Sequence, residues 1–303
     1  MTTEGETLRC NACGWTMPIV QGTPILIFDE RSVFSVKDFI SGQEDGTRIS
    51  YHDAKSLPSF QKRLRRRIAN ALSNREAPVK WFSKEDAMAE VCRRIKRPRI
   101  LIIAAGILRS SGFDAEFTYT DGSLVDGIEY VCDAHDLPFP DETFDLVIAV
   151  ALLEHVADPF RCVSEMTRVL KPNGFVHAES PFLQPVHMGR YDFTRFTPLG
   201  HRRLFRQFDA IQCGVALGPG SVLAWAMRYW LLGLTDNITA RKWIRAFGLL
   251  ITMPIRYSDV IFKNKVGAGD SAGGNLFFGT KTDRQISDRD LLKLYVGRDQ
   301  VYD

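Results

Sequence analysis

The chain has 303 residues, of which 45% are hydrophobic, 11% aromatic and 25% charged, and its net charge is +3. This composition excludes a disordered, collagen-like or disulfide-scaffold protein. The near balance of acidic and basic residues gives no reason to expect a nucleic-acid partner.

The first 30 residues predict a small hairpin, because two apolar runs are separated by a turn at Gln21–Thr23. Cys10 and Cys13 have the spacing of half a zinc ribbon, and the segment resembles the latter part of such a module. Structural zinc needs four ligands, and the sequence has no second such pair, so we predict a remnant without metal. The polar start at Met1–Arg9 and the lack of a membrane-length apolar run predict a cytoplasmic protein.

Residues 31–97 are predicted to form a linker followed by a basic helical segment. Apolar residues recur every four positions, which gives one helical stripe of Phe60, Leu64, Ile68 and Leu72. Lysines and arginines surround this stripe. We favour a helix that packs on the main domain; the alternative is weak contact with an anionic surface such as membrane headgroups or nucleic acid.

Residues 98–282 predict one large α/β domain. Strand-like apolar runs occupy 99–105, 116–120, 128–132, 144–150 and 174–180. Between the last two runs, Asp158 and Pro159 begin a helix with Phe160, Val163, Met166, Val169 and Leu170 on its buried face. Strands that alternate with helices predict a doubly wound, mostly parallel sheet.

Residues 218–268 are predicted as a helical insertion before a late strand at 275–282, and residues 283–303 as a tail. The insertion contains an aromatic stretch with Trp225, Tyr229 and Trp230. We interpret this stretch as core or as the contact of a homodimer; a lipid interface is the alternative.

Residues 132–176 carry four motifs in a characteristic order: Asp133–Phe139, Phe144–Val147, Leu153–His155 and Arg168–Gly174. This segment resembles the class I S-adenosylmethionine-dependent methyltransferases, in particular the type-11 group. The resemblance implies a Rossmann-like sheet of the seven-stranded type, S-adenosylmethionine as cofactor and methyl transfer as the reaction.

The resemblance also implies where the cofactor binds. Asp121 follows the second strand and is expected to bind the ribose hydroxyls, while Asp133 and the Ala134 backbone read the adenine. The family has a glycine-rich loop after the first strand, where this chain has Ala104 and Gly106. Ala104 can replace a glycine there if its φ angle is negative.

The segment after residue 180 supplies the candidate catalytic residues His187, Asp192 and Arg195. His187 is the candidate base, because the pKa of histidine lies near neutrality. Asp192 orients it or binds the acceptor, and Arg195 holds an anionic group of the substrate. The alternative is an Asp192–Arg195 ion pair that only braces the loop.

The predicted function is therefore methyl transfer from S-adenosylmethionine to a small or glycan-like polar acceptor. Two alternatives stay open. One is a degenerate module that keeps the fold without catalysis, and the other is a protein that associates with a membrane surface.

Overall fold

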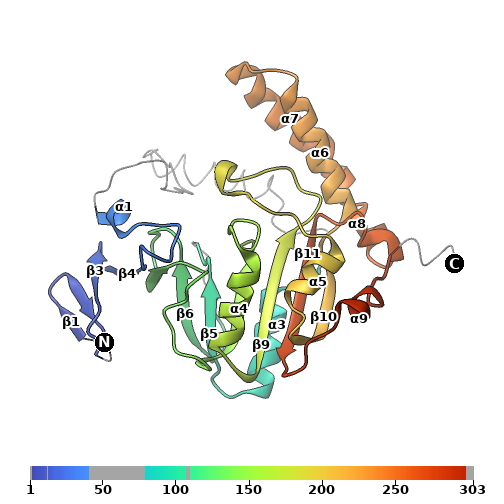
Figure 1. The fold of residues 1–303 in the computed structure, drawn as a ribbon. Helices are drawn as coiled ribbons and strands as arrows, with labels where there is room; N and C mark the ends of the chain where they lie inside the picture. Colours follow the sequence, from blue (N-terminus) through green and yellow to red (C-terminus); the bar gives the residue numbers. More distant parts are fainter. Residues whose placement is uncertain (1, 12, 41–78, 107–109, 298–303) are drawn as a thin grey trace.

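A computed structural model describes residues 2–11, 13–40, 79–106 and 110–297, which form helices packed on one mixed sheet (Figure 1). Within these ranges the strands lie in the order β1-β2-β3-β4-β7-β6-β5-β8-β9-β11-β10. Their bounds are β1 Thr2–Glu4, β2 Thr7–Arg9, β3 Thr16–Val20, β4 Thr23–Leu26, β5 Arg99–Ile103, β6 Glu116–Asp121, β7 Tyr130–Cys132, β8 Phe144–Val150, β9 Leu170–Pro181, β10 Phe208–Leu217 and β11 Gly274–Lys281.

The centre of the sheet is parallel, as predicted. Strands β7, β6, β5, β8 and β9 pair in parallel, whereas β11 runs antiparallel between β9 and β10. From β5 the chain moves outward through β6 to β7 and then returns to the other side of β5 at β8. This reversal is a topological switch point, and ligands of such sheets bind beyond the carboxyl ends of the strands there.

Both faces of the sheet are covered, which explains the nearly continuous apolar runs of the central strands. Ile100 and Leu101 of β5 are fully buried and belong to opposite core clusters. One cluster includes Val163 and Met166 of α4, and the other includes Met88 and Val91 of α3. The helices are α1 Val36–Ile40, α3 Lys84–Arg94, α4 Pro159–Val169, α5 Pro198–Leu204, α6 Pro219–Gly233, α7 Ile238–Arg256, α8 Asp259–Phe262 and α9 Asp288–Leu292.

Helix α4 begins as predicted, since the Asp158 side chain accepts a hydrogen bond from the Arg161 amide at 3.0 Å. The predicted stripe is wrong at two positions. Phe160 is 49% exposed, and Leu170 opens β9 instead of ending the helix. Asn173, where the family pattern has glycine, adopts a left-handed φ of 60°, a conformation that asparagine tolerates better than most residues.

The N-terminal hairpin is confirmed as β3 and β4, but it is joined to the main sheet. Strand β4 pairs in parallel with β7, with Ile25 opposite Val131. Ile25 is fully buried in the core cluster of α3, so the hairpin extends the central sheet by burying its apolar run. The predicted helical stripe of residues 60–72 lies outside the described residues.

The insertion forms a helical hairpin, α6 and α7, which projects from the body of the protein (Figure 1). Its base is fixed by the buried Asp259 of α8, whose carboxylate accepts the Gly220 amide at 2.6 Å and the Ser221 hydroxyl at 2.7 Å. These bonds replace the missing side-chain cap at the start of α6. Among the described residues, no helix combines the length and the apolar character that crossing a membrane requires.

Arg168 in the last turn of α4 connects two of the sequence motifs. Its guanidinium donates to the carbonyls of Leu137 at 2.8 Å and Phe139 at 2.7 Å, and it also pairs with Glu165. We expect Arg168→Ala to lower the free energy of unfolding by about 2 kcal/mol, because two carbonyls and a carboxylate lose their donor. Urea unfolding measures this loss.

The matched control is Arg93→Ala, at the corresponding end of α3. Arg93 is exposed and its ion pair with Glu90 lies at the surface, so the expected loss is below about 0.5 kcal/mol. Equal losses in the two variants would contradict the structural role assigned to Arg168.

Candidate active site

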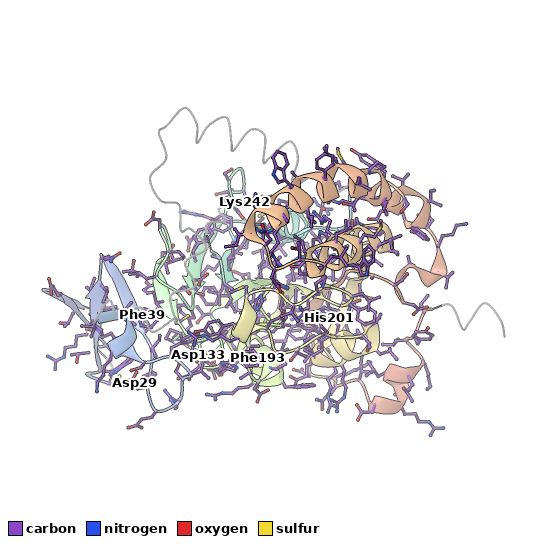
Figure 2. All side chains as sticks on the ribbon, turned by 90° about the horizontal axis from the view of Figure 1, so that it is seen from above. Asp29, Phe39, Asp133, Phe193, His201 and Lys242 are labelled. Carbon is purple, nitrogen blue, oxygen red and sulfur yellow. The ribbon has the colours of Figure 1, made fainter. Side chains whose placement is uncertain are left out.

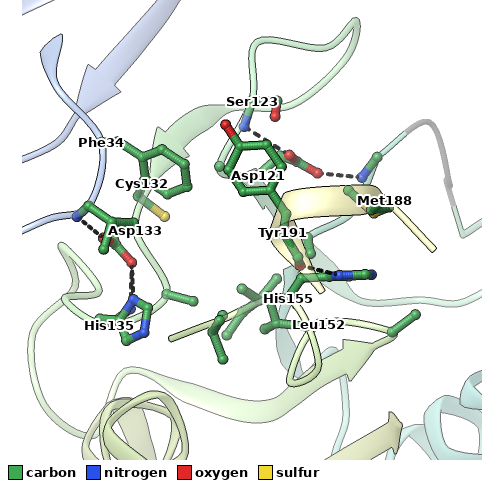
Figure 3. Close-up of a pocket in the computed structure, with 18 of the residues that line it drawn as sticks. Phe34, Asp121, Ser123, Cys132, Asp133, His135, Leu152, His155, Met188 and Tyr191 are labelled. Atoms are coloured by element: carbon green, nitrogen blue, oxygen red, sulfur yellow. Dashed lines mark hydrogen bonds and ion pairs between the residues drawn. The ribbon is translucent and has the colours of Figure 1, made fainter. Parts of the chain in front are cut away.

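A pocket of about 570 Å³ lies beyond the carboxyl ends of β5, β6, β7 and β8, at the switch point of the sheet (Figure 3). Its size falls within the range of small-molecule sites. The turn after β5 contributes Ala104 and Gly106, and the end of β6 contributes Asp121. The pocket therefore contains the residues that the sequence assigned to the cofactor.

The turn after β5 is left-handed at both of these positions. Ala104 has a φ of 54° and Gly106 a φ of 52°. The condition of a negative φ at Ala104 is therefore not met, because the chain needs the same backbone conformation that the family's glycines provide. The turn is held by a hydrogen bond of 2.9 Å from the Ala105 amide to the Thr120 carbonyl. Ala104 consequently carries strain that costs on the order of 1 kcal/mol.

We expect Ala104→Gly to leave the protein as stable or to stabilise it by about 0.5 kcal/mol, because relief of the left-handed strain exceeds the added entropy of the unfolded chain. The adjacent Ala105→Gly is the control. Ala105 is buried and its φ is not positive, so glycine there costs about 1 kcal/mol. Thermal unfolding of both variants shows the sign of each effect. Destabilisation by Ala104→Gly to the same extent as by Ala105→Gly would contradict the strain at Ala104.

Asp121 is 8% exposed and faces the pocket from the end of β6 (Figure 3). One oxygen accepts the Gly106 amide and the other accepts the Ser123 amide, both at 2.9 Å. These bonds hold the carboxylate in one orientation and fasten it to the turn after β5. A fixed carboxylate at this edge is suited to bind paired hydroxyl groups.

Asp133 also lies at the pocket, but its carboxylate already binds the protein. One oxygen accepts from the His135 ring at 2.6 Å and from the His135 amide at 2.9 Å (Figure 3). The other oxygen accepts from the Ser32 hydroxyl at 2.6 Å. Burial raises the pKa of Asp133, but the hydrogen bonds from His135 and Ser32 outweigh this effect and lower it below its usual value. The contacts of Asp133 and Ala134 with an adenine stay a prediction.

The bond from Ser32 brings the N-terminal segment over the pocket, a feature that the sequence did not indicate. Val33 and Phe34 line the pocket, although residues 31–97 were predicted to begin with a linker. The Phe34 ring packs closely on Gly122, and a Cβ atom added to Gly122 would lie only 3.2 Å from the ring. In the sequence, the hydrophobic pair Val33-Phe34 was the one sign that this segment packs on the domain. Only the hydrogen bond from Ser32 to Asp133 shows that it packs over the pocket.

The segment after β9 lines the opposite side of the pocket with Met188, Tyr191 and Phe193. Two hydrogen bonds to the Glu154 carbonyl, from the Phe193 amide at 2.8 Å and the Thr194 amide at 3.3 Å, hold this segment against the end of β8. His155, which follows Glu154, also lines the pocket, and its Nδ1 lies 2.8 Å from the Tyr191 carbonyl (Figure 3).

The structure brings the three candidate catalytic residues together. Asp192 accepts the His187 amide at 2.8 Å and pairs through both oxygens with Arg195. Burial raises the pKa of Asp192, but the hydrogen bonds from Arg195 and the His187 amide outweigh it and lower the pKa to about 2. Arg195 also donates to the carbonyl groups of Gln184 and Pro185, so its donors brace the loop.

His187 is one-third exposed and lies next to His155. The two rings meet edge to face with centroids 4.9 Å apart, and only His155 is among the described residues that line the pocket. The Glu154 carboxylate, 3.7 Å from Nε2 of His187, raises the pKa of that imidazole, while burial opposes the effect. The sequence motif contains Glu154 and His155, but it does not predict their contact with His187.

The pocket fits a nucleoside with a thioether or sulfonium chain. The Asp121 carboxylate suits ribose hydroxyls, and Cys132, Leu152 and Val156 supply an apolar wall for a purine ring. Gly106 leaves open space where a side chain would stand. These residues would hold S-adenosylmethionine without a phosphate-binding loop.

Comparison with known proteins agrees with this arrangement. Residues 110–178 match a family model described as a methyltransferase domain. A ubiquinone/menaquinone biosynthesis C-methyltransferase of Xanthomonas oryzae pv. oryzae is 39% identical over 84 residues, which are 25% of this chain and 32% of that protein. A phosphatidylethanolamine N-methyltransferase of Cereibacter sphaeroides is 54% identical over 44 residues, 14% of this chain and 22% of that protein.

Among solved structures, the Haemonchus contortus phosphoethanolamine N-methyltransferase 2 in complex with S-adenosyl-L-methionine covers 76% of this chain and 61% of its own, with a TM-score of 0.41 and 17% identity. The chain spans about a third of the length of the first curated relatives that it matches. The family match and the four motifs thus fall on the part of the sheet that forms the pocket. Residues 110–178 are therefore similar to the methyltransferase domain family, and this similarity is consistent with S-adenosylmethionine as the cofactor.

Proposed function

We propose that this chain transfers a methyl group from S-adenosylmethionine to a small or glycan-like polar acceptor. One observation carries the proposal: a single pocket is lined by the cofactor-side residues Ala104 and Asp121 and by Tyr191 and Phe193 of the segment after β9. A donor held at the first pair therefore faces an acceptor that enters along the second.

One end of the pocket binds the methyl donor, and the other end activates the acceptor. When bound, S-adenosylmethionine supplies a methyl carbon on a sulfonium that is open to in-line attack. Asp121 and the turn after β5 hold the donor, and Phe34 covers it from water. At the other end, His187 is the proposed base, which takes the acceptor's proton at Nε2. Asp192 and Arg195 position the loop that carries His187.

Calorimetric titration with S-adenosylmethionine and S-adenosylhomocysteine tests the donor half of the proposal. We expect saturable binding of both ligands. Absence of binding at millimolar ligand would support the alternative, a module that keeps the fold without catalysis. Methyl transfer from labelled S-adenosylmethionine to a panel of small hydroxylated and glycosidic acceptors then tests the acceptor class.

A second candidate function, association with an anionic membrane surface, is favoured by the exposed face of α7. Trp243, Phe247, Leu250 and Ile251 recur at helical spacing and are each at least 57% exposed. Lys242 and Arg245 belong to the same helix, and Lys242 lies on the projecting hairpin (Figure 2). An exposed apolar face on a helix that also carries cations matches the interface of a membrane with anionic headgroups. Tyr229 and Trp230 of α6 are exposed as well, so the predicted core packing is wrong for these two residues.

Sedimentation with vesicles tests this second function. We expect binding to phosphatidylcholine vesicles that contain an anionic lipid, and at least about tenfold weaker binding after Trp243→Ser with Phe247→Ser. Leu292→Ser on α9 is the control, because Leu292 is equally exposed but lies away from the hairpin. Failure to sediment at low salt would reject the lipid surface. A dimer that depends on α7, detected by analytical ultracentrifugation, would assign this face to a second copy of the chain instead.

A further inference from the structure

Two imidazoles and a carboxylate converge at the acceptor end of the pocket. Oε1 of Glu154 lies 3.7 Å from Nε2 of His155 and 3.7 Å from Nε2 of His187. The three ligand atoms lie within 4.8 Å of one another, and no other group of His, Cys, Asp or Glu in the described parts of the chain meets in this way. Ligands of one zinc ion are about 3 to 3.5 Å apart, so small side-chain rotations would close the set on a metal.

The Glu154 side chain supplies independent evidence for a ligand. It is fully buried, and neither of its carboxylate oxygens has a hydrogen-bond partner within the described residues. A buried carboxylate without donors costs several kcal/mol unless a cation compensates for it. Both contacts with the histidine rings, at 3.7 Å, are too long to be hydrogen bonds.

The outer nitrogen of the His155 ring has the partner that a metal-binding histidine needs. Nδ1 of His155 lies 2.8 Å from the Tyr191 carbonyl, which can only accept, so this nitrogen carries the proton and Nε2 has a lone pair. Nδ1 of His187 lies 3.4 Å from the Pro185 carbonyl and 3.6 Å from Oδ2 of Asp192, which both accept, and 3.4 Å from the Arg195 guanidinium, which can only donate. In the tautomer that carries its proton on Nδ1, the lone pair of Nε2 faces Glu154.

We propose that Glu154, His155 and His187 form a binding site for a divalent cation of the zinc class beside the acceptor end of the pocket. The ligand set favours zinc or a neighbouring transition metal over the hard ions Mg²⁺ and Ca²⁺, because two of the three ligands are imidazoles. From the sequence, no metal was expected in this chain.

The site gives the proposed function another way to activate its acceptor, in place of proton transfer to His187, whose Nε2 would be a metal ligand; in this respect the inference rests on that function. Three protein ligands leave at least one coordination position open, and His155 is at the pocket wall. An acceptor hydroxyl at that position loses its proton to water more readily, because the cation stabilises the oxyanion. The oxyanion then forms the bond to the methyl carbon while the carbon–sulfur bond breaks and its electron pair returns to sulfur.

The test is a titration of the full chain, purified without a polyhistidine tag, with Zn²⁺ and with Co²⁺ as a spectroscopic probe. Cys10→Ser and Cys13→Ser form the background, because thiolates would otherwise bind both metals. We expect one tight site per chain with visible Co²⁺ absorption bands. His187→Gln and Glu154→Gln should each weaken the binding about 100-fold or more.

Glu179→Gln is the matched control. Glu179 pairs with His177 at 2.9 Å, a contact between a histidine and a carboxylate without a second imidazole, and its loss should leave metal affinity unchanged. His187→Gln is the decisive variant, since His187 is partly exposed and its replacement is expected to fold. Wild-type metal affinity in this variant, or no Co²⁺ bands in the background chain, would overturn the site.

The donor end provides a separate readout. Titration with S-adenosylhomocysteine in the presence of a chelator reports on Asp121 and the turn after β5, which do not touch the three ligands. Binding of the nucleoside without metal binding would reject the cation site and retain the methyltransferase. Loss of both would count against the proposed function as well.

Discussion

Asp121→Asn is expected to weaken the binding of S-adenosylmethionine about 100-fold. The carboxylate is fixed by the Gly106 and Ser123 amides and faces the pocket. A hydrogen bond to a charged acceptor contributes about 1.5 to 3 kcal/mol, and the neutral amide of asparagine can accept at only one atom. Two weakened ribose contacts therefore amount to about 3 kcal/mol, or about two orders of magnitude in the dissociation constant. Calorimetric titration measures the change.

Asp126→Asn is the control for this experiment. Asp126 lies on the same loop between β6 and β7 but is exposed and outside the pocket wall. Its substitution should leave the dissociation constant within about twofold, because a distant exposed charge is screened by salt. If Asp121→Asn binds the cofactor as tightly as Asp126→Asn does, the ribose-binding role of Asp121 is wrong. Thermal unfolding of both variants shows whether the loop remains folded.

Acidification from pH 6.5 to pH 5 is expected to remove about 2 kcal/mol of stability through His201 alone. This residue of α5 is 2% exposed (Figure 2). The centroid of its ring lies 5.2 Å from the centroid of the Phe205 ring. Burial lowers the pKa of His201 to about 3, and the neighbouring His177 and Arg202 act in the same direction. The unfolded chain binds a proton at this position below about pH 6.5, and the folded chain does not. Stability therefore falls by about 1.4 kcal/mol for each pH unit in this window.

Urea unfolding of His201→Met at pH 7 and pH 5 isolates this contribution. Methionine cannot titrate and has a similar volume, so the variant should lose about 2 kcal/mol less than the wild-type chain between the two pH values. His201→Gln, a neutral polar replacement, should show the same reduced dependence even if it is less stable at pH 7. Parallel losses in the wild-type chain and both variants would mean that His201 is protonated in the folded state. The unfolding measurements are kept at pH 5 and above, because carboxylates begin to titrate below pH 5.

The sequence determined the centre of the sheet and the general place of the cofactor. Strands β5 and β8 are buried on both faces, and such strands show nearly continuous apolar runs that can be recognised without a structure. Helix α4 was predictable from its cap at Asp158 and its period. Asp121 and Asp133 follow strands, and parallel strands bring their carboxyl ends to one edge. Local signals were sufficient for these features.

Other elements lacked such signals. Strand β10 was not predicted, because it is an edge strand whose residues from Asp209 to Gly214 are exposed and lack an apolar period. The strand pairing of β4 with β7 and the cover by Phe34 join residues about 100 positions apart. No local pattern encodes contacts of this length, because each partner alone has the composition of a hairpin or a linker.

The site shows the same division at the level of single residues. The sequence identified Ala104 and His187 as neighbours of a cofactor or an acceptor, and it placed Glu154 and His155 in one of the four motifs, since residue type and order are local properties. Only the tertiary structure decided that Ala104 is left-handed and that Glu154 is buried without a donor between two imidazoles. Backbone strain and a buried carboxyl group without a donor depend on what surrounds a residue in space. Local residue types therefore identify the candidates, and the packing determines their chemistry.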